Sequence, residues 1–130
     1  MPPPPVGFVS VPCPPDKALV YLYRVRPWIA VGDKIKMFAN GAPVVTLRGR
    51  EYSPLFLDPG NVTLSHEVDM EFGQRWLMDD LRIHLEAGKT YFVAYRFWIN
   101  PFKRPNPTMV LVDSDTGEGE MSICAVKKPL

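Results

Sequence analysis

The chain is poor in the residues that most often carry chemistry. It has only two histidines and two cysteines among 130 residues, and the cysteines lack the C-x-x-C spacing of redox and zinc sites. Its 15 basic and 14 acidic residues leave a formal net charge of +1. That balance lacks the basic stripe typical of nucleic-acid binding, so we expect no nucleic-acid partner.

Long apolar runs are absent as well. No stretch approaches the roughly 18 apolar residues that cross a bilayer, so we expect no transmembrane segment. The chain starts at Met1 without a charged or apolar leader, which leaves two alternatives. Either the protein is cytoplasmic, or a signal segment lies upstream and has been removed. Val11, Pro12 and Cys13 do not form a lipid-attachment signature, because proline stands where small residues are expected.

Proline is concentrated at the start of the chain, where it makes up seven of the first fifteen residues. Proline cannot donate a backbone hydrogen bond and stiffens a chain toward polyproline II. We therefore predict an extended linker over residues 1–15, partly laid on the domain or acting as a tether. Residues 16–130 are the right length for a single domain with one core.

Short β-type segments separated by turns fill the rest of the chain. Residues 17–24 are apolar on both faces, which predicts a central strand covered on both sides. Asn40 and Gly41 stand between two alternating segments, and this pair favours the positive φ values of a type I′ hairpin. Seven to eight such strands, without crossover helices, predict an all-β fold, an antiparallel β-sandwich.

Three segments have no clear strand pattern. Residues 68–79 and 99–107 are predicted to be loops, because the first has no clean period and the second is interrupted by prolines. Residues 115–126 fit either a short C-terminal helix or a strand. Asp115 and Glu118 have the spacing of a capping box, whereas Gly117 and Gly119 oppose a helix.

The two cysteines, Cys13 and Cys124, allow two interpretations. They are either unrelated thiols, one in the proline tail and one in the core, or a disulfide that ties the tail to the C-terminal segment. A disulfide would require an oxidising compartment.

Five segments in a fixed order carry a resemblance to a known family. They are DKALVYLYR (16–24), FANGAPVVTL (38–47), REY (50–52), DPG (58–60) and LEAGKTYFV (85–93). Together they resemble the bacterial domain-of-unknown-function 2846 family, whose members are often small envelope lipoproteins. More loosely, they are similar to PEGA and carboxypeptidase-regulatory β-sandwich modules.

The resemblance implies a β-sandwich in the periplasm or outer envelope, with cytoplasmic location as the alternative. It also implies a removed signal segment and a lipid anchor upstream of this chain. It implies no known activity, so no catalytic residue is carried over from it.

Catalytic and metal-binding constellations are missing from the sequence. Strand alternation predicts that His66 and His84 point to opposite faces, which opposes a shared metal site. None of the serines lies in a Gly-x-Ser-x-Gly elbow. We therefore predict a non-enzymatic protein with no catalytic residue, no metal and no cofactor.

Large aromatic residues gather in the segments predicted to be loops. They are typical either of caps over the open ends of a sandwich or of a protein-binding surface, where Trp, Phe and Arg are favoured. The predicted partner surface consists of Trp28, Phe72, Trp76, Trp98, Phe102 and Arg104. The sequence thus predicts an interaction or structural module that binds another envelope protein. The alternative is a small-ligand or glycan-binding domain that uses Trp76, Trp98 and Phe102.

Overall fold

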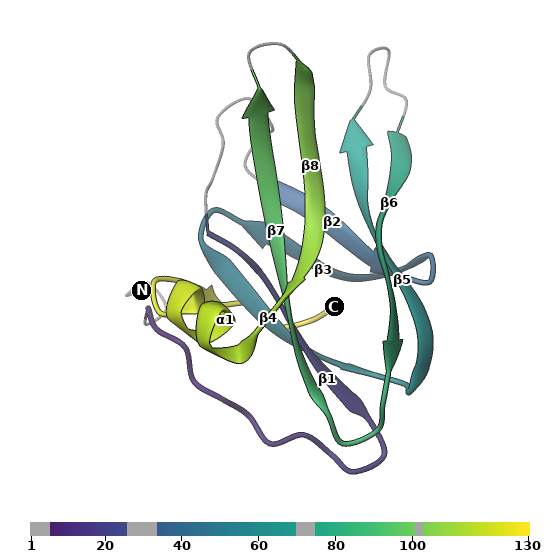
Figure 1. Ribbon diagram of the computed structural model, residues 1–130, viewed down its shortest axis with the longest axis vertical. Helices are drawn as coiled ribbons and strands as arrows, with labels where there is room; N and C mark the ends of the chain where they lie inside the picture. The colour runs from purple at the N-terminus through teal and green to yellow at the C-terminus, as the bar shows by residue number, and fades with distance from the viewer. Residues whose placement is uncertain (1–5, 26–33, 70–74, 101–102) are drawn as a thin grey trace.

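The computed structural model describes residues 6–25, 34–69, 75–100 and 103–130, with the backbone alone at 68–69, 75–77, 97–100 and 103–108. These residues form nine strands and one helix (Figure 1). The elements are β1 (Ala18–Arg24), β2 (Lys34–Ala39), β3 (Ala42–Arg48), β4 (Glu51–Leu57), β5 (Gly60–Asp69), β6 (Arg75–Leu85), β7 (Thr90–Asn100), β8 (Lys103–Val112), α1 (Ser114–Met121) and β9 (Ala125–Val126).

The strands form two sheets, with the orders β8-β7-β1-β4-β9 and β3-β2-β5-β6. The predicted all-β sandwich is confirmed. The prediction that residues 17–24 form a central, doubly covered strand is also confirmed, because β1 lies between β7 and β4 and every one of its residues is buried.

The pairing differs from a purely antiparallel sandwich in two places: β1 with β7 and β4 with β9 are parallel. A parallel pair needs a crossover connection, which is usually a helix. Here the chain between β1 and β7 instead forms β4 of the same sheet and all four strands of the other sheet. The absence of a crossover helix in the sequence therefore could not exclude a parallel pair.

The main core lies between the two sheets. It is made of the inward side chains of alternating strand positions, as the period of two requires. Its buried members are Ala18, Val20, Leu22, Ile35, Met37, Ala39, Val45, Leu47, Leu55, Val62, Leu64, Leu85, Val93, Tyr95 and Met109.

A second core covers the outer face of the five-stranded sheet. Met121, the last residue of the helix, and Cys124, which follows it, pack against side chains that face outward from the sheet. These side chains are Leu19, Tyr21, Tyr23, Tyr52, Phe92 and Ala94. The N-terminal segment covers the same face (Figure 1). The fold therefore has a third layer that strand patterns alone do not reveal.

The N-terminal segment is packed on the domain over residues 6–15 rather than free of it. The ring of Phe8 lies edge-on to Tyr21, with a centroid distance of 5.0 Å. The backbone N–H of Val11 donates to the Tyr21 hydroxyl at 2.8 Å, and that of Gly7 donates to the carbonyl of Cys124 at 2.9 Å. Residues from Val6 onward therefore contribute to the folded unit.

Helix α1 settles the alternative left open for residues 115–126 in favour of a short helix, followed by the short strand β9. The cap is Asp113, not Asp115: its side chain accepts from the backbone N–H of Thr116 at 2.7 Å. Glu120 at the end of the helix accepts from Tyr23 at 2.6 Å and from both terminal nitrogens of Arg96. These bonds attach the helix to the sheet.

The turn between β2 and β3 has the conformation that the sequence predicts. Asn40 and Gly41 have φ values of 49° and 81°, the two positive values of a type I′ turn.

The prediction of loops at 68–79 and 99–107 is wrong over most of both ranges. β5 and β6 pair as far as Asp69 and Arg75, and β7 and β8 as far as Asn100 and Lys103. Prolines within 103–112 made that range look irregular. However, β8 is an edge strand, and an edge strand tolerates residues that cannot donate to a neighbour.

Candidate functional site

The β5–β6 and β7–β8 hairpins end at the same end of the sandwich (Figure 1). β6 also lies against β8, so the two hairpins are neighbours although they belong to different sheets. Their last backbone pairs are Asp69 with Arg75 and Asn100 with Lys103. We call this region the hairpin end.

Three residues of the predicted partner surface belong to the hairpin end. Trp76 lies on β6 opposite Val68, Trp98 lies on β7 opposite Asn106, and Arg104 lies on β8. The topology thus brings residues almost thirty positions apart in sequence to one end of the fold. Trp28, Phe72 and Phe102 lie outside the described residues.

A buried polar cluster lies in the core between the sheets. Nδ1 of His66 and Oδ2 of Asp80 are 2.5 Å apart, and the two side chains are only 2% and 4% exposed. The ring of Tyr95 stands edge-on to the His66 ring at 5.3 Å. Nε2 of His66 and the hydroxyl of Tyr95 are buried and have no hydrogen-bond partner among the described residues. We call His66, Asp80, Tyr95 and the buried Arg24 the inner cluster.

The electrostatics of the inner cluster follow from burial. Burial raises the pKa of Asp80, against the lowering effect of the hydrogen bond with His66. Burial also raises the pKa of Tyr95; the charge of Asp80 adds to this rise and that of Arg24 opposes it. Because these four groups are covered, the cluster acts on the stability and specificity of the core rather than on an accessible ligand.

The sequence prediction that His66 and His84 face opposite ways is confirmed, since His66 is buried and His84 is exposed. It missed Asp80. A register irregularity between Leu64 and Ser65 lets β6 carry an extra residue at this point, so that Ser65 pairs with Asp79 and Asp80 turns inward. Strict alternation cannot place a residue at a bulge. Within the described residues, no group of three potential metal ligands comes together.

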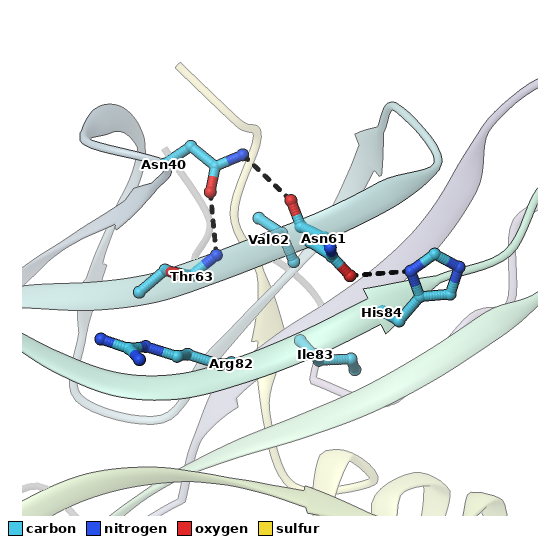
Figure 2. Close-up of a pocket in the computed structure, with 7 residues that line it drawn as sticks. All are labelled: Asn40, Asn61, Val62, Thr63, Arg82, Ile83 and His84. Carbon is cyan, nitrogen blue, oxygen red and sulfur yellow. Dashed lines mark hydrogen bonds between the residues drawn. The ribbon is translucent and has the colours of Figure 1, made fainter.

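A polar hollow of about 500 Å³ lies on the outer side of the four-stranded sheet (Figure 2). Two cross-strand pairs of β5 and β6 supply most of its lining, Asn61 with His84 and Thr63 with Arg82. Asn40 reaches it from the β2–β3 turn, and Val62 and Ile83 complete the lining. We call it the β5–β6 hollow.

Hydrogen bonds hold three side chains of the β5–β6 hollow in place. Nδ1 of His84 donates to Oδ1 of Asn61 at 2.8 Å, and the backbone N–H of Thr63 donates to Oδ1 of Asn40 at 2.9 Å. Nδ2 of Asn40 donates to the backbone carbonyl of Asn61 at 3.5 Å. Figure 2 shows these bonds joining the turn, β5 and β6 across the hollow. Both amide oxygens are thereby engaged as acceptors.

Cys13 and Cys124 are free thiols in the structure, the first partly exposed and the second buried. The thiol of Cys13 faces the carbonyls of Pro14 and Lys17, whereas that of Cys124 faces the carbonyls of Arg24 and Glu120. Burial raises the pKa of Cys124 to about 11, which keeps it protonated and unreactive at neutral pH.

No model of a known protein family matches the chain, and neither do any curated protein or solved structure. The likeness to the domain-of-unknown-function 2846 family therefore remains a prediction from the five sequence segments. Within the residues described, no helix has the length and apolar character needed to traverse a membrane.

Proposed function

We propose that the protein is a non-enzymatic interaction module whose hairpin end binds another protein. The observation that carries this proposal is the position of Trp76, Trp98 and Arg104 on two neighbouring hairpins that finish at the same end of the sandwich. Tryptophan and arginine supply much of the binding energy in protein interfaces, because they combine large contact areas with directed hydrogen bonds. A surface built from strand ends is also more rigid than one built from long loops.

The partner in this proposal is another protein of the bacterial envelope, and the module works in the periplasm or at the outer envelope. The likeness of the five sequence segments to small envelope lipoproteins supports this location. In such a setting the N-terminal proline segment would connect the domain to an anchor. Protease accessibility of the protein in intact and permeabilised cells tests the location directly.

Chemical cross-linking followed by affinity capture from the membrane fraction tests the partner. The variant replaces Trp76 and Phe102 with alanine; the control replaces Phe56 and Ile123, which are 46% and 50% exposed elsewhere on the domain. We expect the wild type and the control to retain one stoichiometric envelope protein that the variant loses, while all three keep the same melting temperature. Equal recovery by the variant would place the partner on another surface.

A misfolded variant would assign Trp76 and Phe102 to the core. In that case a photo-cross-linking residue at position 98, compared with one at position 56, replaces the double variant as the test. Cross-links from position 98 alone are the expected outcome. Cross-links from position 56 alone contradict the proposal.

A further inference from the structure

We propose that the β5–β6 hollow binds a tetrahedral oxyanion, namely a phosphate group. This site is separate from the hairpin end, and its ligand is independent of the protein partner proposed above. Its volume of about 500 Å³ falls within the roughly 300 to 1,000 Å³ of small-molecule sites. It can therefore hold a phosphate group together with part of the molecule that carries it.

As far as the structure describes it, the lining of the hollow is rich in donors and contains no carboxylate. The bonds that engage the amide oxygens leave Nδ2 of Asn61 directed at no described acceptor, and the hydroxyl of Thr63 is likewise uncommitted. Asn, Thr and Arg side chains together offer amide, hydroxyl and guanidinium donors. Such a set suits a ligand that accepts hydrogen bonds on several sides.

Arg82 supplies the charge. Among the described residues it forms no hydrogen bond or ion pair, although its cross-strand neighbour Thr63 lies at the same hollow. The acids near Arg82 along the chain are engaged elsewhere: Asp79 accepts from Ser65, Asp80 contacts His66, and Glu86 pairs with Lys89 just beyond the end of β6. A guanidinium beside unused neutral donors, without a competing carboxylate in the lining, favours an anion.

A tetrahedral oxyanion fits this lining better than a carboxylate does. A carboxylate is planar, and one guanidinium fork saturates its edge. A phosphate has further oxygens, and these can accept from Asn61 and Thr63 while two others pair with Arg82. The hydrogen-bonded positions of Asn40, Asn61 and His84 mean that little reorganisation accompanies binding.

Backbone and side-chain amide NMR at constant ionic strength tests the proposal, with inorganic phosphate, glycerol 3-phosphate and acetate as probes. We expect saturable shifts at the side-chain amide of Asn61 and the backbone amide of Thr63 with both phosphates and not with acetate. Tighter binding of glycerol 3-phosphate would identify a phosphate ester as the ligand class, and tighter binding of inorganic phosphate would identify the free ion. No saturable shift, or equal binding of acetate, would overturn the proposal.

Two variants and one control make the test specific. Arg82→Gln should weaken phosphate binding about fivefold or more, whereas Arg48→Gln, which removes the same charge from the opposite edge of the same sheet, should leave it unchanged. Asn61→Asp keeps the acceptor for His84 and exchanges the amide donor for a negative charge, so it should abolish binding. Equal weakening by Arg48→Gln would show that net charge alone attracts the anion and would overturn the site.

Discussion

An ideal Cβ atom on Gly117 would lie 2.6 Å from Cδ1 of Phe92, so helix α1 can pack on the sheet there only because position 117 has no side chain. Phe92 faces outward from β7 into the second core, directly under the helix. The glycine therefore has a packing role that its weak helix propensity conceals.

Substitution of the two helix glycines separates packing from propensity. Alanine at either position favours the helix by about 1 kcal/mol. At Gly117 the overlap with Phe92 should exceed this gain, so that Gly117→Ala lowers the free energy of unfolding by about 1 to 2 kcal/mol. No atom of the described part of the chain lies within 4 Å of an ideal Cβ on Gly119, so Gly119→Ala should raise it by about 0.5 to 1 kcal/mol. Urea denaturation measures both, and the same sign for the two variants would contradict the packing role.

Gly117 also shows where sequence reasoning reaches its limit. Two glycines within eight residues oppose a helix, and only the contact with Phe92, 25 positions earlier, explains one of them. The central strand β1 and the Asn40-Gly41 turn were predictable because their signals are local: apolar residues on both faces, and a pair that adopts positive φ. The parallel pairing of β1 with β7 is a long-range property and leaves no local signal.

In the candidate sites, too, residue types could be predicted from local sequence, whereas positions that depend on long-range pairing could not. Trp76 and Trp98 could be singled out by residue type, but their position on neighbouring hairpins depends on the topology. Asp80 could not be predicted as buried, because the bulge that turns it inward breaks the alternation on which the prediction rests. The β5–β6 hollow likewise depends on a register that pairs Asn61 with His84.

Replacement of Asp80 with alanine tests the inner cluster. The change leaves Nδ1 of His66 buried without its partner, which should lower the free energy of unfolding by at least about 2 kcal/mol. Asp79→Ala is the control: Asp79 is exposed and its side chain accepts from Ser65 at 2.9 Å, so the loss should stay below about 1 kcal/mol. Chemical denaturation at pH 7 compares the two, and equal losses would show that the His66–Asp80 contact adds nothing specific.

Asp80 should also give the protein a characteristic pH dependence. Its pKa is raised in the folded state above the ordinary 3.8. Between pH 3.8 and this raised pKa, the folded protein therefore binds more protons than the unfolded chain does. Its contribution to stability is therefore fully present below about pH 3.8 and is lost as the pH rises through the raised pKa. As the pH falls, the free energy of unfolding of the wild type should therefore rise relative to that of the Asp80→Asn variant. A difference that is constant with pH would contradict the raised pKa.

The two cysteines should differ sharply in reactivity. Cys124 is fully buried with a pKa raised to about 11, whereas Cys13 is partly exposed in the N-terminal segment. In the native protein a thiol reagent should modify Cys13 first and reach Cys124 only as the domain opens. In the Cys13→Ser variant the labelling rate of Cys124 should rise with denaturant. Absence of any free thiol in the non-reduced native protein would instead support the disulfide.

The attachment of helix α1 to the sheet should depend on the charge of Glu120. Its carboxylate accepts from the Tyr23 hydroxyl at 2.6 Å and from Arg96 at 2.7 and 3.0 Å. Glu120→Gln keeps the size of the side chain and removes the charge, so it should lower the free energy of unfolding by about 1 to 2 kcal/mol. Glu118→Gln, on an exposed position of the same helix, is the matched control and should change it by less than about 0.5 kcal/mol.

Two further measurements distinguish this attachment from a general effect on the fold. Burial is the main reason that the pKa of Tyr23 lies above its ordinary value, and the hydrogen bond to Glu120 adds to it. Glu120→Gln should therefore lower the pKa of Tyr23 in a spectroscopic titration without returning it to the ordinary value. Backbone amides of the helix should also exchange faster with solvent, because the charge-assisted bonds that attach the helix to the sheet are weakened. Unchanged exchange in the helix together with an unchanged Tyr23 pKa would show that the Glu120 bonds do not hold α1 in place.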